Sequence, residues 1–463
     1  MDSFISVEKI NTLLKRTRDV PLRDINSIIQ KGISLKGLEL EEAAALLQCT
    51  DKEKVNEIYC AAGSVKESVY GKRLVLFAPL YLSSTCINSC LYCGFRRENR
   101  VAERNVLTYE EVALETEVLI RDGHKRLLLV AGEDPARCGI DYIERAIEVV
   151  YGTRTEVGGI KRVNVNVAPM SVKGFQRLKS TGIGTYQLFQ ETYHQPTYRR
   201  FHPAGPKSNY ITRLFALDRA QEAGIDDVGM GVLFGLYDYR FETLALMCHV
   251  RHLEGEFGVG PHTISVPRIE PASNSPISKY PPYKVSDESF KKLVAILRLA
   301  VPYTGMILST REDTIFRDEL LNIGISQISA NSKTYPGGYS RKDDSGNSSG
   351  QFLIGDKRTT SEVINDISRH GFTPSFCTAC YRVGRTGREF MDYAKPGQIQ
   401  RFCLPNSLLT FKEYLLDFGT DNLQKSGETI IREQLASIKD QKIRSATKKK
   451  LKEVEEGGRD IYF

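Results

Sequence analysis

The chain has 463 residues, of which 41% are hydrophobic and 26% are charged. This composition excludes a disordered chain and is enough to bury one large domain with an appendage, or two to three ordinary domains. The formal net charge of +7 is modest, and no apolar run reaches the ~18 residues that a membrane span needs. We therefore expect a cytoplasmic protein, in which ten cysteines indicate metal ligands and buried thiols rather than disulfides.

The chain begins with an expected N-terminal helical extension over residues 1–73, with helix-like patterns at 39–47 and 51–70. The apolar stretch Leu74 to Leu82 that follows predicts a buried β-strand. The first chemical motif therefore lies directly behind a strand rather than inside a helix.

Three cysteines stand in that motif, TCINSCLYCGF, as Cys86, Cys90 and Cys93. A CxxxCxxC loop at a strand end can wrap three thiolates around a 4Fe-4S cluster and leave the fourth iron open for S-adenosylmethionine (SAM). A closed zinc site would need a fourth ligand, and none lies near the triplet. Disulfide pairing would leave one cysteine over, and thioredoxin-like chemistry needs a CxxC alone. The open cluster is the favoured interpretation.

Beyond this loop, short β-branched or apolar runs alternate with longer helical patterns, which is typical of βα units around a parallel sheet. Eight such units predict a (β/α)8 TIM barrel over residues 74–370, followed by a mainly helical appendage over 371–463. The other predicted strands are 126–131, 163–168, 184–189, 227–234, 262–267, 305–309 and 326–330. The predicted helices are 109–122, 140–151, 172–179, 210–223, 239–255, 287–300, 317–323 and 361–370.

Candidate ligands follow the carboxyl ends of several predicted strands, where TIM barrels hold their active sites. Each alone is more often a capping or surface residue, but their convergence with the cysteine loop on one face predicts a single site. A carboxylate behind a glycine could hold the methionine ammonium of SAM, and a guanidinium offers a planar fork to a substrate carboxylate. These candidates are Gly132, Glu133, Asn166, Met170, Gln190, Glu191, Ser309, Thr310, Arg311 and Glu312.

A second motif lies in the expected appendage, where Cys377 and Cys380 form a CxxC and Cys403 follows after 22 residues. Three thiolates again indicate a cluster with an open iron, and a structural zinc completed by a distant residue is the alternative. The helix before this motif should return the chain to the bottom of the barrel. His262 opens the sixth predicted strand at the same end and is therefore a candidate ligand. The two centres are expected at opposite mouths of one barrel.

Three remaining features receive less specific interpretations. The basic stretch 439–452 is expected to be a solvated terminal helix rather than a nucleic-acid site, although a positive surface also suits an acidic electron donor such as a ferredoxin or flavodoxin. The segment 341–350, rich in Asp, Ser and Gly, is expected to be a flexible excursion. Structural roles are expected for His194, His202, His249, His252, Cys49, Cys60, Cys138 and Cys248.

The cysteine triplet resembles that of radical SAM enzymes, in which the aromatic residue at the position of Tyr92 lies against the adenine. From about residue 73 to 419 the chain closely resembles the tyrosine lyases that mature the FeFe-hydrogenase. The related 2-iminoacetate synthases of thiamine biosynthesis share the barrel and tyrosine cleavage but lack the C-terminal CxxC with its distant third cysteine. The matching stretches are CINSCLYCGFRREN, FQETYHQPTYRRFHPAGPKSNY, DDVGMGVLFGLYDYRFE, FGVGPHTISVPRIEPA and CTACYRVGRTGREFMDYAKPGQIQRFCLPNSLLTFKEYL.

This resemblance implies that a cluster held by Cys86, Cys90 and Cys93 reduces SAM. The resulting radical takes a hydrogen atom from the amino group of L-tyrosine, which is cleaved into p-cresol and dehydroglycine. Dehydroglycine is converted to carbon monoxide and cyanide, which are assembled at a second 4Fe-4S cluster. That cluster carries an extra iron bridged by free L-cysteine. Its implied ligands in this chain are Cys377, Cys380 and Cys403, with His262 on the extra iron.

We also expect small products to cross the barrel interior rather than the cytoplasm. Arg311 is the candidate for the tyrosine carboxylate, with Ser309 and Thr310 as supporting donors. Other hydrogenase maturases are possible partners, whereas no nucleic acid or membrane is expected. The alternatives are a tyrosine lyase that stops at dehydroglycine, and a non-catalytic iron-sulfur scaffold.

Overall fold

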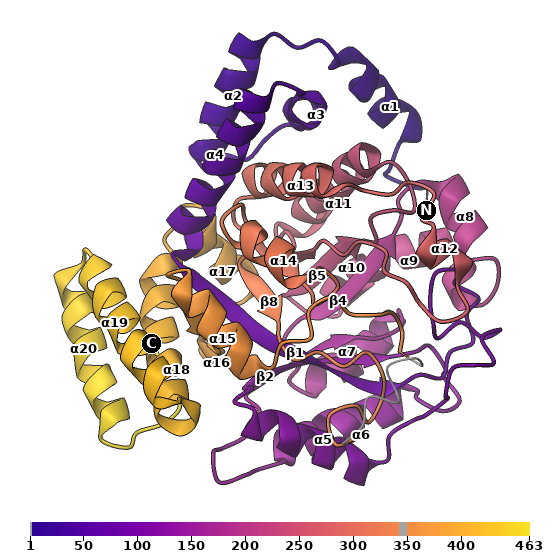
Figure 1. The fold of residues 1–463 in the computed structure, drawn as a ribbon. Helices are drawn as coiled ribbons and strands as arrows, with labels where there is room; N and C mark the ends of the chain where they lie inside the picture. Colours follow the sequence, from indigo (N-terminus) through magenta and orange to yellow (C-terminus); the bar gives the residue numbers. More distant parts are fainter. Residues whose placement is uncertain (1, 342–349) are drawn as a thin grey trace.

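The computed structural model describes residues 2–341 and 350–463, so the predicted excursion at 341–350 lies almost entirely outside the described residues. Its centre is a closed barrel of parallel strands surrounded by helices (Figure 1). The predicted TIM barrel is thereby confirmed. Its strands are β1 (Arg73–Ser83), β2 (Arg126–Ala131), β3 (Arg162–Asn166), β4 (Tyr186–Glu191), β5 (Val228–Val232), β6 (Thr263–Ser265), β7 (Gly305–Leu308) and β8 (Gln327–Ser329).

Strand β1 closes the barrel and also carries an additional strand that the sequence did not indicate. Residues Val75 to Phe77 pair with β8, and Ala78 to Ser83 pair with β2. The short strand β9 (Thr373–Ser375) pairs in parallel with Arg73 to Val75. Because Val75 pairs with both β8 and β9, β9 lies on the β2 edge of β1, below the point where β2 begins. The C-terminal region is therefore joined to the barrel sheet before it becomes helical.

One main helix follows each barrel strand, and local capping explains where several of them begin. Thr108 and Glu111 form a reciprocal capping box at the start of one helix, as do Thr359 and Glu362 at another. The predicted helix 210–223 is interrupted at Phe215, whose φ of −89° and ψ of 19° depart from helical values. The helices are α5 (Tyr109–Arg121), α6 (Ile140–Gly152), α7 (Val172–Ser180), α10 (Ala216–Glu222), α11 (Tyr239–Phe257), α13 (Asp287–Ala300), α14 (Thr314–Leu321) and α15 (Thr360–Arg369).

Short elements are inserted after β4 and β6, on the face where these strands end. The insertion after β4 contains α8 (Gln195–Phe201), the 3-10 turn η1 (Pro206–Ser208) and α9 (Tyr210–Leu214). The insertion after β6 contains α12 (Pro276–Lys279). These insertions shape the upper mouth of the barrel, where the cysteine loop also lies.

Helices before and after the barrel form the expected extensions (Figure 1). The N-terminal helices are α1 (Val7–Arg16), α2 (Leu22–Ile33), α3 (Leu40–Gln48) and α4 (Lys52–Tyr70), and α4 packs on α13 and α2. The C-terminal helices are α16 (Ala379–Arg382), α17 (Gly387–Ala394), α18 (Gln400–Phe418), α19 (Asp421–Ser437) and α20 (Gln441–Glu455). Helix α18 lies against β9, α19 and α20. Helices α18, α19 and α20 form the group drawn in orange and yellow beside the barrel (Figure 1).

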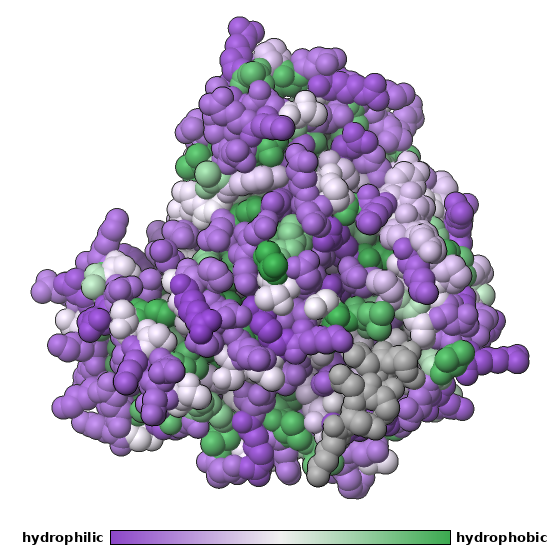
Figure 2. All heavy atoms as spheres, viewed as in Figure 1, coloured by the Kyte–Doolittle hydropathy of each residue, from purple (hydrophilic) through white to green (hydrophobic). Residues whose placement is uncertain are grey.

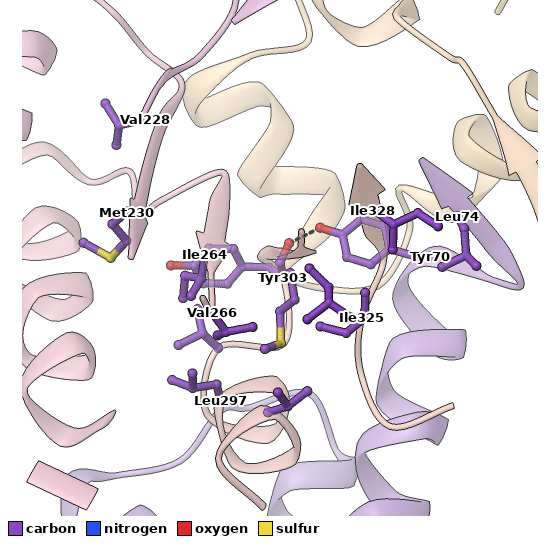
Figure 3. Packing of buried hydrophobic residues seen from close by; sticks show 14 of the residues in the cluster. Tyr70, Leu74, Val228, Met230, Ile264, Val266, Leu297, Tyr303, Ile325 and Ile328 are labelled. Carbon is purple, nitrogen blue, oxygen red and sulfur yellow. Dashed lines mark hydrogen bonds between the residues drawn. The ribbon is translucent and has the colours of Figure 1, made fainter. Parts of the chain in front are cut away.

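The core between strands and helices is apolar and locks the N-terminal extension onto the barrel. Tyr70 ends α4, and its hydroxyl donates a hydrogen bond to the carbonyl of Tyr303, beside Leu74, Ile325 and Ile328 (Figure 3). The face in Figure 2 is largely hydrophilic, with apolar residues scattered over it. Among the described helices, none combines the length and apolar character that crossing a bilayer requires.

Candidate functional site

The barrel interior contains two cavities, and inward-facing side chains of β1 line both of them. Even-numbered residues such as Leu74 and Leu76 are fully buried in the core, whereas the odd-numbered ones face the barrel interior. Val75 lines a lower cavity of ≈ 40 Å³, and Phe77 and Tyr81 line an upper cavity of ≈ 210 Å³. The two cavities therefore follow one another along the barrel axis, with the larger one at the carboxyl ends of the strands.

The cysteine loop after β1 lines the upper cavity with the side chains of Cys86, Cys90 and Cys93. Two N–H groups point at sulfur atoms: the Phe95 amide lies 3.4 Å from Cys93 Sγ, and Asn88 Nδ2 lies 3.7 Å from Cys86 Sγ. Burial raises the pKa of Cys93 to about 11 and that of Cys90 to about 12. At neutral pH such thiols ionise only where a cation stabilises the thiolate. The iron of a cluster would provide that positive charge. The donor set fits an iron-sulfur cluster.

The end of β2 holds this loop in place through Gly132 and Glu133. A Cβ on Gly132 would lie 2.2 Å from the carbonyl oxygen of Thr85 and 3.2 Å from Cys86 Cβ, so only glycine allows this approach. The Glu133 carbonyl accepts a hydrogen bond from the Ile87 amide at 2.8 Å. Its carboxylate accepts one from Asn88 Nδ2 at 2.6 Å. Glu133 therefore lines the cavity beside the cysteine loop, where it was expected to hold an ammonium group.

A second charged group lies at the end of β4, around Glu191. Its backbone is left-handed, with φ of 71°, and its carboxylate lies 2.6 Å from Lys207 Nζ and 3.4 Å from Arg213. Burial opposes ionisation, but the two cations outweigh it and hold the pKa of Glu191 below its usual value. Lys207 and Arg213 also line the cavity. Neither was predicted, although Lys207 belongs to the long matching stretch over residues 189–210 and Arg213 lies just beyond it.

Tyr92 faces the cavity between the last two cysteines, and its orientation depends on His202. The Tyr92 hydroxyl lies 2.8 Å from His202 Nε2, and His202 Nδ1 lies 2.8 Å from the carbonyl of Tyr198. A carbonyl only accepts, so Nδ1 carries the proton and the Tyr92 hydroxyl donates to Nε2. Burial holds the pKa of His202 well below its usual value, so the imidazole is neutral. The sequence predicted only a structural role for His202.

The ends of β7 and β8 supply the other side of the cavity. Ser309, Thr310 and Arg311 line it as predicted. The Arg311 guanidinium lies 3.3 Å from the centre of the Phe352 ring, and the one hydrogen bond that it donates to a described residue, the Arg268 carbonyl, is long at 3.4 Å. Glu270, from the loop after β6, also lines the cavity. Neither Glu270 nor Phe352 was among the predicted residues.

Phe352 belongs to a strap over residues 350–356 that crosses the upper mouth. The Gln351 carbonyl accepts a hydrogen bond from the Gly94 amide at 3.0 Å, and its side chain accepts one from the Tyr81 hydroxyl at 2.8 Å. Amides of the strap donate to the carbonyls of Pro271 and Thr310, each at 2.8 Å. The strap thus ties the cysteine loop to the loops after β6 and β7.

Asn166 lines the upper cavity, but three other predicted residues do not. The β4 register shifts between Phe189 and Glu191, and both of these face the cavity. Gln190 between them is therefore turned away, and its prediction as a cofactor ligand is corrected. Glu312 accepts hydrogen bonds from Arg268 at 3.0 and 3.1 Å, and Met170 lies outside the lining.

The lower cavity brings together Cys377, Cys380 and Cys403 with His262, at the end where these residues were expected. His262 Nδ1 lies 3.5 Å from the Asp227 carboxylate, and the ring packs 4.2 Å from that of Phe390. Burial raises the pKa values of Cys377 and Cys380, as in the upper loop. Arg73 and Arg126 also line this cavity. The donor set suits a second cluster, with an imidazole available beside it.

Comparisons with known proteins show the family to which this fold belongs. The radical SAM superfamily model matches residues 80–249, and the biotin and thiamin synthesis associated domain matches residues 265–373. The 2-iminoacetate synthases of Salmonella typhimurium and Escherichia coli are 31% and 30% identical to the chain over 348 residues, which cover 75% of this chain and 89% of each enzyme.

Two solved structures are similar over nearly the whole chain. A crystal structure of HydG, described as a maturase of the [FeFe]-hydrogenase, has 52% identity and a TM-score of 0.96, with 100% of both chains covered. The FeFe-hydrogenase maturase HydG from Carboxydothermus hydrogenoformans has 43% identity and a TM-score of 0.83, with 96% of this chain and 100% of that chain covered.

Proposed function

Because the chain belongs to the radical SAM superfamily and, within it, to the family of the FeFe-hydrogenase maturase HydG, we propose that it cleaves L-tyrosine into p-cresol and dehydroglycine. The observation that carries this proposal is the upper cavity. It combines a cysteine triplet suited to an open cluster with an arginine whose guanidinium, among the described residues, contacts only the Phe352 ring and one carbonyl at 3.4 Å. A radical generated there is enclosed by the barrel and by the strap, away from bulk water.

The protein's own side chains divide this cavity into a cofactor part and a substrate part. Cys86, Cys90 and Cys93 would hold the cluster, which when bound supplies the electron that converts SAM into the 5′-deoxyadenosyl radical. Tyr92 lies where it can contact the adenine. The polar groups of SAM would be bound by side chains at the ends of β2, β3 and β4, namely Glu133, Asn166, Glu191, Lys207 and Arg213.

The substrate part is the side of the cavity with Arg311. A tyrosine carboxylate would accept two parallel hydrogen bonds from its guanidinium, and Ser309 and Thr310 would supply further donors. Phe352 stacks on the same guanidinium and keeps its plane fixed. Such binding would orient the amino acid end of the substrate within the cavity.

For the second stage, we propose that dehydroglycine is converted to carbon monoxide and cyanide, which are assembled at the lower cavity for FeFe-hydrogenase maturation. Cys377, Cys380 and Cys403 would hold the second 4Fe-4S cluster, and His262 would ligate an additional iron bridged by free L-cysteine. Val75 lines the lower cavity, and Phe77, the next inward-facing residue of β1, lines the upper one. This closeness of the cavities supports transfer through the barrel interior.

The likeness to 2-iminoacetate synthase favours a second candidate, in which the reaction stops at dehydroglycine. The lower cavity weighs against it, because three cysteines and a histidine gathered at the lower end of the barrel have no role in that reaction. A non-catalytic scaffold would have no use for the charged groups of the upper cavity. The complete two-centre reaction therefore accounts for more of the molecule.

The reaction requires an electron donor, and the surface around the cysteine loop suits an acidic one. Leu91, in the loop, receives a hydrogen bond from Ser275 and donates one to Phe201, so the loop, α8 and α12 meet there. These three segments present five exposed cations, Arg97, Arg100, Arg199, Arg200 and Lys279. We propose that a ferredoxin or flavodoxin docks on them. Other hydrogenase maturases are further proposed partners.

The proposed activity is tested by an anaerobic assay of the reconstituted, reduced protein with SAM and L-tyrosine. We expect p-cresol and 5′-deoxyadenosine from the wild type and neither product from the Cys86→Ser variant. Cys60→Ser is the matched control, because Cys60 is exposed on α4 and should retain full activity. SAM cleavage without p-cresol would contradict tyrosine cleavage, and absence of SAM cleavage would favour the scaffold.

A further inference from the structure

The carboxylate of Glu270 lines the upper cavity, but it neither stabilises the fold through a described contact nor belongs to the groups proposed to bind SAM. It follows β6 and directly precedes Pro271, whose carbonyl accepts a hydrogen bond from the strap. The nearest cation along the chain is Arg268, which is occupied by Glu312 and by Asp287 at 2.7 Å. Within residues 2–341 and 350–463, no side chain or amide forms a hydrogen bond or ion pair with the Glu270 carboxylate.

Arg311 is the cation that remains opposite this carboxylate. Both side chains line the same cavity, and each favours the charged form of the other. Within the part of the chain that the structure describes, the Arg311 guanidinium contacts the Phe352 ring and one carbonyl at 3.4 Å, which leaves most of its N–H donors unused there. The cavity thus holds an anion and a cation that influence one another electrostatically, and no short contact with a described residue neutralises either.

This pair has the charge pattern of an α-amino acid binding site. The zwitterionic end of an amino acid carries a carboxylate and an ammonium group on neighbouring atoms, and each needs an opposite charge when it leaves water. SAM also carries such an end, but in the proposed function it is bound by charged groups that follow β2 and β4: Glu133, Glu191, Lys207 and Arg213 line the cavity with the cysteines. A second set, after β6 and β7, fits a second amino acid.

Resting on the proposed function, we propose that Glu270 and Arg311 clamp the zwitterionic end of L-tyrosine, with Arg311 binding the carboxylate and Glu270 accepting a proton from the ammonium. In this step the N–H bond breaks, its electron pair stays on nitrogen, and an O–H bond forms on the carboxylate. The amino group of the bound tyrosine is then uncharged. Loss of a hydrogen atom from that amine leaves a neutral nitrogen radical rather than a cation.

The environment of Glu270 suits a proton acceptor at neutral pH. Burial raises the pKa of Glu270 to about 7, with a further contribution from Glu312, against the opposing effect of Arg311. The basic form is present above this pKa and is lost as the pH falls through it. Tyrosine cleavage should therefore weaken on the acid side of neutrality.

The test compares wild type, Glu270→Gln and Glu270→Asp as reconstituted holoenzymes, with p-cresol formation measured from about pH 6 to about pH 9. We expect Glu270→Gln to lower kcat/KM for tyrosine by about 10²-fold and to remove the acid limb of the profile. Glu270→Asp should keep that limb, and KM for SAM should stay unchanged in both variants. Glu256→Gln, an exposed carboxylate on α11, is the matched control.

Two substrate analogues test Glu270 and Arg311 separately, and their binding to the wild type is informative even if a variant fails to fold. In the wild type, tyramine, which lacks the carboxylate, should bind more tightly above neutral pH, when Glu270 is ionised. Desaminotyrosine, which lacks the ammonium, should bind more tightly below it. In Glu270→Gln, tyramine should lose affinity while desaminotyrosine should not.

The possible failures are distinguishable. A Glu270→Gln enzyme with the wild-type acid limb and kcat/KM would overturn the clamp and leave tyrosine cleavage intact. The same pH dependence for both analogues would also overturn it. Absence of p-cresol from the wild type would overturn the proposed function, and the clamp with it.

Discussion

Val75 and Phe77 are successive inward-facing residues of β1, yet they line different cavities. The smaller cavity holds the C-terminal cysteines and the larger one holds the cysteine loop. A molecule that moves between them along the barrel axis would pass the inward-facing side chains at the level of these two residues. This relationship makes the barrel interior the shortest route between the two proposed reactions.

Narrowing this route should separate the two stages of the reaction. We expect Val75→Phe to leave p-cresol formation within about threefold of wild type, while carbonylated iron species decrease and more cyanide appears in solution. The larger ring costs about 1–3 kcal/mol of stability by overpacking, so Val75→Leu serves as a milder comparison. Equal yields of carbonylated iron from all three proteins would count against internal transfer.

The hydrogen bond between Tyr92 and His202 should make the two residues contribute jointly to protein stability. His202→Ala leaves the buried Tyr92 hydroxyl without its acceptor and should cost about 1–3 kcal/mol of unfolding free energy. Tyr92→Phe removes both the donor and this penalty, so the double variant should be less destabilised than the sum of the two single ones. Chemical denaturation of the four proteins measures the coupling, and strict additivity would argue against it.

Gly132 should be essential for the upper cluster. Gly132→Ala places a methyl group against the Thr85 carbonyl and the Cys86 side chain, which forces the cysteine loop outward. We expect loss of the iron bound by the upper loop, with retention of the iron at the C-terminal cysteines. Gly152→Ala is the control, because nothing lies within 4 Å of a Cβ there. Iron and sulfide analysis of the reconstituted proteins would distinguish them, and full occupancy in Gly132→Ala would be contrary to this expectation.

Arg311 should determine the affinity for tyrosine. Arg311→Lys keeps the positive charge but loses the planar fork and the stacking on Phe352. The loss of charge-assisted hydrogen bonds, about 1.5–3 kcal/mol, should raise KM for tyrosine by about 10- to 100-fold. KM for SAM should not change. An equal rise in both constants would place Arg311 in the cofactor part instead.

Much of the architecture could be predicted because its signals are local. Strand β2 and helix α13 were predicted with their observed bounds, since each is a short apolar run or a strong helical pattern between clear end signals. Strand β9 was missed because three residues carry no periodicity, and its pairing with β1 is a tertiary contact. The interruption at Phe215 depends on backbone angles that helix propensity does not reveal.

The site was predictable where a residue directly follows a strand and much less so elsewhere. Glu133, Asn166 and Arg311 stand at strand ends and line the cavity as expected. Gln190 occupies the same kind of position but is turned away by an irregular register. Glu270 and Phe352 come from loops beyond their strands, where no pattern marks the inward-facing residue. Only the folded path of the strap brings Phe352 onto Arg311.

The central claim is that one barrel carries out two reactions at two separate centres. Infrared spectroscopy of the reduced holoenzyme with SAM, L-tyrosine and free L-cysteine tests it directly, with p-cresol measured in the same samples. We expect iron-bound carbon monoxide and cyanide bands in the wild type, and p-cresol without these bands in the Cys377→Ser, Cys380→Ser double variant. Unchanged bands in the double variant, or joint loss of p-cresol and bands in a folded protein that retains the upper cluster, would contradict the account.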